Sequence, residues 1–149
     1  MSDRVASGDA PKDESRVASG DAPKDESRGV SVEVQPEFRA DESAPGEGRY
    51  VFSYTVTVHN ASRHSVQLMA RHWTITQGSG KVQDVRGKGV VGQQPVIGPG
   101  QHFRYTSRAI LDGPVGVMQG DYTCVDTATQ RPFEVPIAPF RLACPNQVH

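Results

Sequence analysis

The segment 87–92 reads GKGVVG and fits the pattern GxGxxG, which in dinucleotide-binding folds lets the backbone approach a pyrophosphate. That chemistry also needs a helix directly after the glycines, because the first N–H groups of the helix face the phosphates. Gln93-Gln94-Pro95 follows here and would end a helix before it begins. The sequence therefore disfavours a dinucleotide site.

A weaker anion site stays open at the same glycines, because exposed backbone N–H groups beside a basic side chain can hold an anion. The residues of this site would be Gly87, Lys88, Gly89 and Gly92. The alternative is that the glycines only allow positive φ in a long loop between strands. No cofactor is assigned on either interpretation.

Four apolar residues lie in and after the glycine motif, in a region rich in glycine and proline that is hard to bury completely. They are Val90, Val91, Val96 and Ile97. They could line a surface groove for an extended partner segment. The alternative is that they pack into the core.

Histidines and nucleophiles offer no recognisable constellation. His59, His64 and His72 are five and eight residues apart, which matches no zinc or facial-triad spacing. Ser107 and Cys124 could act as nucleophiles, but neither lies in a GxSxG elbow or a comparable turn. We therefore assign no catalytic and no metal-binding residue, and predict that the protein is not an enzyme.

The composition fits one globular domain: 149 residues, a net charge of −1, 36% hydrophobic and 22% charged residues. No apolar run reaches the roughly 18–20 residues of a membrane span, and no signal peptide is recognisable. We expect a cytoplasmic protein without membrane insertion. Basic residues are dispersed along the domain, which makes nucleic-acid binding unlikely. Two cysteines are too few for a disulfide scaffold.

The N-terminal segment repeats RVASGDAPKDES at residues 4–15 and 16–27 and holds almost no large apolar side chain. Such a segment cannot bury enough surface to offset its ordering entropy. We predict a disordered tail over residues 1–29 and a folded domain over residues 30–149.

From residue 30 the apolar residues alternate with a period of two, which is typical of half-buried strands. We expect Pro36 to end the first strand, and Pro136 and Pro139 to place the last one at an edge or beside a bulge. The predicted fold is all-β, an antiparallel immunoglobulin or fibronectin type III-like sandwich of about seven to eight strands. Its strands are Val30–Val34, Tyr50–Asn60, Val66–Thr76, Val82–Val85, Phe103–Leu111, Met118–Asp126 and Phe133–Leu142.

The large side chains of these strands predict the core. Leu68 and Trp73 would fall on opposite faces of a regular strand, so a bulge between them is needed if both are buried. Tyr122 lies two residues before Cys124, the spacing of a tyrosine corner, and Cys124 is interpreted as a buried thiol. The expected core contains Phe52, Tyr54, Val56, Trp73, Phe103, Tyr122 and Phe140.

Several short motifs in order resemble the bacterial ApaG family over about residues 30–149. They are RYVF at 49–52, YTV at 54–56, VQL at 66–68, RHW at 71–73, GKGVVG at 87–92 before Gln94-Pro95, YTS at 105–107, MQG at 118–120 and FRL at 140–142. The resemblance implies a fibronectin type III-like sandwich, an association with cobalt tolerance and magnesium efflux, and a possible pyrophosphate or nucleotide site at Gly87, Gly89 and Gly92. It also implies a protein-binding role, because related domains occur in eukaryotic F-box and polymerase-delta-interacting proteins.

Together these observations predict a non-enzymatic binding module for a protein partner of unknown identity. The alternative is a module that binds an anion or nucleotide at the glycine motif.

Overall fold

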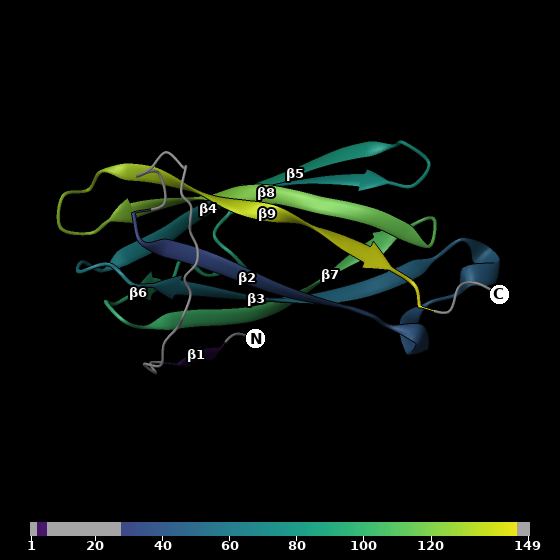
Figure 1. Cartoon of the computed structure of the whole chain (residues 1–149), viewed down its shortest axis with the longest axis horizontal. Coiled ribbons are helices and arrows are strands. Elements are labelled where there is room, and N and C mark those ends of the chain that lie inside the picture. Colours follow the sequence, from purple (N-terminus) through teal and green to yellow (C-terminus); the bar gives the residue numbers. More distant parts are fainter. Residues whose placement is uncertain (1–2, 6–27, 146–149) are drawn as a thin grey trace.

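The computed structural model describes residues 3–5 and 28–145, and its strands form two antiparallel sheets that face each other (Figure 1). The first sheet has the order β1-β7-β3-β2, with β1 (Asp3–Val5), β7 (His102–Leu111), β3 (Tyr50–Asn60) and β2 (Val30–Phe38). The second has the order β5-β4-β8-β9, with β5 (Val82–Lys88), β4 (Val66–Gln77), β8 (Val115–Asp126) and β9 (Pro132–Ala143). The predicted all-β sandwich is confirmed.

Three short elements complete the described chain. Strand β6 (Val96–Ile97) pairs with β4, and two 3-10 turns, η2 (Ala40–Glu42) and η3 (Pro45–Glu47), connect β2 to β3. Strand β1 pairs with β7, so part of the predicted tail is paired. Residues 1–2 and 6–27 of the predicted disordered segment lie outside the described residues.

The core lies between the sheets and contains the large side chains that alternation predicts. Phe52, Tyr54 and Val56 of β3 are buried, and Phe140 packs against the buried cluster from β9. Apolar surface removed from water is the main favourable term in folding, so this layer stabilises the sandwich.

Strand β4 contains the predicted bulge. Leu68 pairs with Cys124 and Ala70 with Thr123, so Met69 is an extra residue without a partner on β8. The bulge brings Leu68 and Trp73 to the same inner face, and both are buried. The Trp73 ring meets the Tyr54 ring edge-on, with centroids 5.5 Å apart.

Two expected strand ends were wrong, and the spacing of Tyr122 and Cys124 has a different structural role from that in immunoglobulin domains. Strand β2 continues through Pro36 to Phe38, because β2 is an edge strand whose outer side needs no N–H donor. Strand β5 extends to Lys88 rather than Val85. Tyr122 does not form a tyrosine corner: its hydroxyl bonds the Tyr105 hydroxyl instead of a backbone group.

The position of the last strand in its sheet is the one expected from its two prolines. Strand β9 lies at the edge of its sheet, and its pairing with β8 shifts register between Met118 and Gly120. Pro136 and Pro139 therefore remove N–H donors where the sheet tolerates the loss.

The two long sides of the sandwich differ. Strands β2 and β9 run close to each other and close one side (Figure 1). On the other side, β5 is an edge of its sheet, and among the described residues the outer edge of β7 pairs only with β1, at residues 102–104. The β5–β7 side therefore presents two strand edges that face each other. Within the described ranges, no helix is long and apolar enough to cross a membrane.

The register shift in β8 generates a first prediction. A Cβ at Gly120 would overlap the carbonyl oxygen of His72 and lie 3.1 Å from the Trp73 Cα. We expect Gly120→Ala to lower the free energy of unfolding by about 2 kcal/mol or more, measured by urea denaturation. Gly46→Ala is the control, because no atom lies within 4 Å of a Cβ there. Equal effects of the two substitutions would contradict the close approach of β8 to β4.

The Asp126 carboxylate generates a second prediction, because it holds the turn after β8. Its oxygens accept hydrogen bonds from the N–H groups of Ala128 and Thr129, and one lies 2.9 Å from His64 Nδ1. The His64 hydrogen bond is the main cause that lowers the pKa of Asp126 in the folded protein, and the two backbone bonds add to it. A lowered folded-state pKa stabilises the fold above the unfolded-state pKa, and this contribution is lost as the pH falls.

We therefore expect Asp126→Asn to lower the urea midpoint at pH 7, with the difference from wild type closing as the pH falls from about 5 towards 2. A difference that is constant over this range would show that the charge of Asp126 does not contribute.

Candidate functional site

A groove runs along the open β5–β7 side and reaches inward between the sheets. Its main part has a volume of about 360 Å³. The floor comes from Tyr54, Trp73 and Met118, and the rims come from Val85 on β5 and Ala109 on β7. A smaller hollow of about 160 Å³ continues from it towards the glycine motif. Its walls are Tyr54, Arg71, Trp73, Val90, Val91, Gly92, Tyr105 and Ser107.

The turn that closes this hollow is strained. Val90 and Gln93 exchange both backbone hydrogen bonds at 2.8 Å, and the two residues between them have positive φ, 40° at Val91 and 80° at Gly92. This is the pattern of a type I′ turn, whose first central position favours Asn, Asp or Gly. A β-branched valine at positive φ costs roughly 1–3 kcal/mol. Backbone strain of this kind clusters at functional sites.

Two glycines of the motif have packing roles. The guanidinium of Arg71 lies only 2.7 Å from where a Cβ of Gly87 would be, so the side chain of Arg71 passes over this glycine. Gly89 has φ 64°, and a Cβ there would overlap the carbonyl oxygen of Gln93. The N–H of Gly89 donates to the carbonyl of Met69 at 2.7 Å. This amide is therefore already paired and is not offered to an anion.

The side chain of Arg71 ends at the inner hollow. Its Nη1 donates to the carbonyl oxygens of Gly89 at 2.8 Å and of Lys88 at 3.4 Å. Neither groove segment has an acidic residue in its wall, and no carboxylate of residues 28–145 forms an ion pair with this guanidinium. Arg71 thus contributes a positive charge without an ion-pair partner to a partly enclosed space, although it also lines the outer hollow that contains Asp121 and Glu134.

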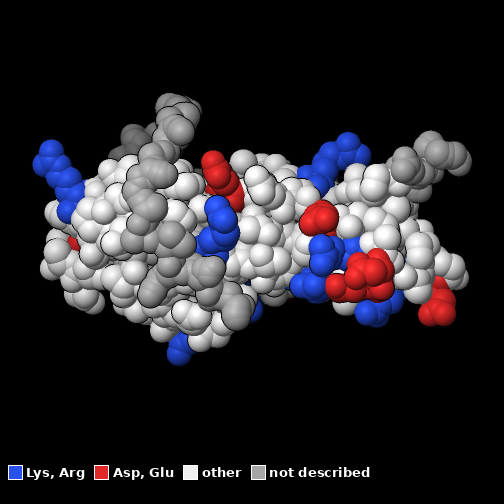
Figure 2. Space-filling model, turned by 90° about the horizontal axis from the view of Figure 1, so that it is seen from below, with Lys and Arg blue, Asp and Glu red and all other residues white. Residues whose placement is uncertain are grey.

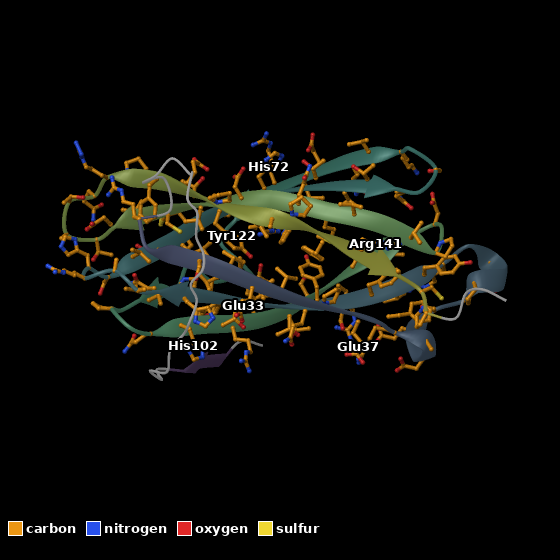
Figure 3. The ribbon with its side chains drawn as sticks, viewed as in Figure 1. Glu33, Glu37, His72, His102, Tyr122 and Arg141 are labelled. Atoms are coloured by element: carbon orange, nitrogen blue, oxygen red, sulfur yellow. The ribbon has the colours of Figure 1, made fainter. Side chains whose placement is uncertain are left out.

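Three buried tyrosines lie next to this charge. The hydroxyls of Tyr105 and Tyr122 are hydrogen-bonded to each other, and Figure 3 shows Tyr122 between the sheets. Tyr54 and Ser107 both line the two groove segments. Burial raises the pKa of all three tyrosine hydroxyls, so they stay protonated and uncharged at neutral pH. The floor of the groove is therefore aromatic with a few polar groups, as in many binding sites.

The four apolar candidates divide into two pairs. Val90 and Ile97 are buried in the core, which corrects the expectation that they could contact a partner. Val91 and Val96 are 41% and 51% exposed. Because β5 and β6 both pair with the same edge of β4, the two exposed valines follow one edge of the sheet.

The residues predicted for an anion site do not share one surface. Lys88 faces the outer side of the second sheet, where it lines a shallow hollow of about 670 Å³ together with His72, Arg86, Asp121 and other residues. Gly92 lines the inner hollow instead. The segment after Gly92 is a turn and the short strand β6, so no helix N-terminus faces the glycines.

The histidines are held by separate partners. His64 bonds Asp126, whereas His72 lies 3.1 Å from Asp84 on the outer face of the second sheet. His59 stacks near His102 on the first sheet, and Figure 3 shows His72 and His102 at opposite sides of the sandwich. No group of three metal-ligating side chains was found in the part of the chain that the structure describes.

The nucleophile candidates are placed as follows. Cys124 is buried, and burial raises the pKa of its thiol to about 12, so the thiol stays protonated at neutral pH. Ser107 lines the groove, and no histidine of the described residues lines either groove segment.

Charged side chains are mixed on the outer face of the first sheet, where basic and acidic surfaces lie side by side (Figure 2). An example is the pair of hydrogen bonds that Arg108 donates to Glu42, both 2.8 Å long. This face therefore has no continuous positive surface among the residues described.

Sequence reasoning missed Arg71 and Tyr105 as groove residues. A signal existed, because Arg71 and Trp73 are two residues apart and share a face once Trp73 is placed inward. Their proximity to the glycine turn depends on the pairing of Arg71 with Gly87. The alternation of apolar residues along each strand does not specify this pairing.

Comparison with known proteins identifies the family. The ApaG domain (DUF525) matches residues 40–126. Protein ApaG of Chromohalobacter salexigens is 76% identical over 120 residues, which cover 80% of this chain and 94% of that protein. Protein ApaG of Pectobacterium atrosepticum is 49% identical, with 80% and 95% covered. A crystal structure of an ApaA protein from Bordetella pertussis is 48% identical, has a TM-score of 0.76 and covers 79% of this chain and 95% of its own. The chain belongs to the ApaG family.

Proposed function

We propose that this protein is a non-enzymatic binding module that takes an extended segment of a protein partner along the β5–β7 side. The observation that carries the proposal is the open groove between two strand edges, with aromatic side chains at its floor. An unpaired strand edge offers a row of N–H and C=O groups to an added strand, and adjacent pockets select its side chains.

The strained turn supports the same surface. Val91 is the first central residue of a turn whose sequence is Val-Gly, although Asn-Gly would fit without strain. Its side chain is partly exposed at the wall of the inner hollow. A strained, exposed apolar residue is explained if the partner covers it.

In this proposal, the association of the ApaG family with cobalt tolerance and magnesium efflux is an indirect consequence of partner binding. The histidines support an indirect effect, because His64 and His72 are bonded to different carboxylates on different parts of the surface. Nucleotide binding at the glycine motif is the less supported function, since Gly89 donates its N–H within the protein and Lys88 faces the other side of the sheet.

The test separates folding from docking at Val91. We expect Val91→Asn to raise the free energy of unfolding by roughly 1 kcal/mol, because Asn tolerates positive φ in a type I′ turn. The same substitution should reduce capture of a specific cytosolic partner by the full chain, because the apolar contact is lost. Denaturation and quantitative pull-down measure the two effects.

Val117→Asn is the matched control, because Val117 is 37% exposed and, unlike its neighbour Met118 on β8, lines neither groove segment. It should leave capture unchanged. If Val91→Asn captures the partner as well as wild type does, or if Val117→Asn loses it, the docking surface is not the β5–β7 side.

A further inference from the structure

We infer that the inner hollow of the groove binds a carboxylate of the docked segment, so that Arg71 selects partners with an acidic side chain or a free C-terminus. This inference rests on the proposed docking function and specifies the chemistry of the partner. Its basis is a convergence of unpaired hydrogen-bond donors around one positive charge.

The donors come from two parts of the described chain, strand β4 and the turn at residues 90–93. The amides of Val91 and Gly92 form no backbone hydrogen bond, because only Val90 and Gln93 are paired in that turn. Arg71 uses only Nη1 within the protein, which leaves Nε and Nη2. The indole N–H of Trp73 has no acceptor among the described residues.

These side-chain donors are not completely enclosed by the protein. Among the described residues that are not exposed, Nε of Arg39 is the one fully buried side-chain nitrogen or oxygen without a partner. The free nitrogens of Arg71 and Trp73 are therefore not sealed completely within the protein. Both residues line the 160 Å³ hollow together with Val91 and Gly92, the two residues whose amides are unpaired.

Charge and size favour a carboxylate over a phosphate. The hollow contains one cation, which neutralises one carboxylate but leaves a phosphate dianion with excess charge. The planar guanidinium also matches a carboxylate through paired hydrogen bonds. Lys88, which could add the second charge, faces the outer side of the sheet. Trp73 and Val91 give the hollow apolar walls, which strengthen a charge-assisted hydrogen bond.

The test uses the full chain, labelled for amide and indole NMR, and four probes. Three are acetylated pentapeptides of alternating threonine and valine: one with a central glutamate and an amidated end, one with glutamine in its place, and one with a free C-terminal carboxylate. The fourth is inorganic phosphate. We expect the glutamate or the free-carboxylate peptide to shift the Val91 and Gly92 amides and the Trp73 indole, with a dissociation constant about tenfold below that of the glutamine peptide.

Arg71→Gln removes the charge but keeps a donor for the Gly89 carbonyl, and it should abolish this tenfold preference. Arg86→Gln is the matched control on the outer face of the neighbouring strand, and it should keep the preference within about twofold. Should Arg71→Gln not fold, Ser107→Ala, at the opposite wall, provides the second variant: it should alter the shifts that the carboxylate causes at Trp73.

Three results would overturn the inference: equal affinity for the glutamate and glutamine peptides, tighter binding of phosphate than of either carboxylate peptide, or loss of the preference in Arg86→Gln alone. Equal affinity accompanied by shifts along residues 82–92 would leave the docking function standing and remove only the carboxylate. A preference confined to one carboxylate peptide identifies whether the group comes from a side chain or a chain end.

Discussion

One extra residue in β4 decides which side chains of this strand lie between the sheets. Because Met69 has no partner on β8, the strand changes face after Leu68, and Arg71, Trp73 and Ile75 all turn inward. Without the bulge, the same alternation would bury His72 and expose Trp73. The aromatic floor of the groove and the charge at its inner end both depend on this shift.

The glycines of the motif leave room for the side chain of Arg71, which the bulge turns inward. Gly87 lies opposite Arg71 and leaves room for its guanidinium, and Gly89 allows the carbonyl of Gln93 to approach. Gly92 completes the tight turn that follows. A pattern that resembles a phosphate-binding loop is thus explained by packing around an arginine side chain, and its open amides belong to the turn rather than to a helix N-terminus.

The sequence predicts the sandwich because period-two alternation, as in Tyr50–Asn60, directly reports which face of a strand is buried. It even predicts the bulge, since Leu68 and Trp73 could not otherwise share a face. It does not predict that Pro36 lies within a strand, because edge position is a property of the assembled sheet. It also leaves open which of Val90, Val91, Val96 and Ile97 are exposed, since that depends on a turn with φ values that valine rarely adopts. The position of Arg71 over Gly87 requires the register of two strands, which no local pattern contains.

The central claim is that the β5–β7 side is the surface a partner covers. Hydrogen exchange of the full chain, free and bound to its captured partner, tests it at the level of single amides. The account predicts slower exchange in the complex at Val91, at Gly92 and along the outer edge of β5, with little change in β2 and β9. Protection confined to β2 and β9, with residues 82–92 exchanging as in the free protein, would contradict it.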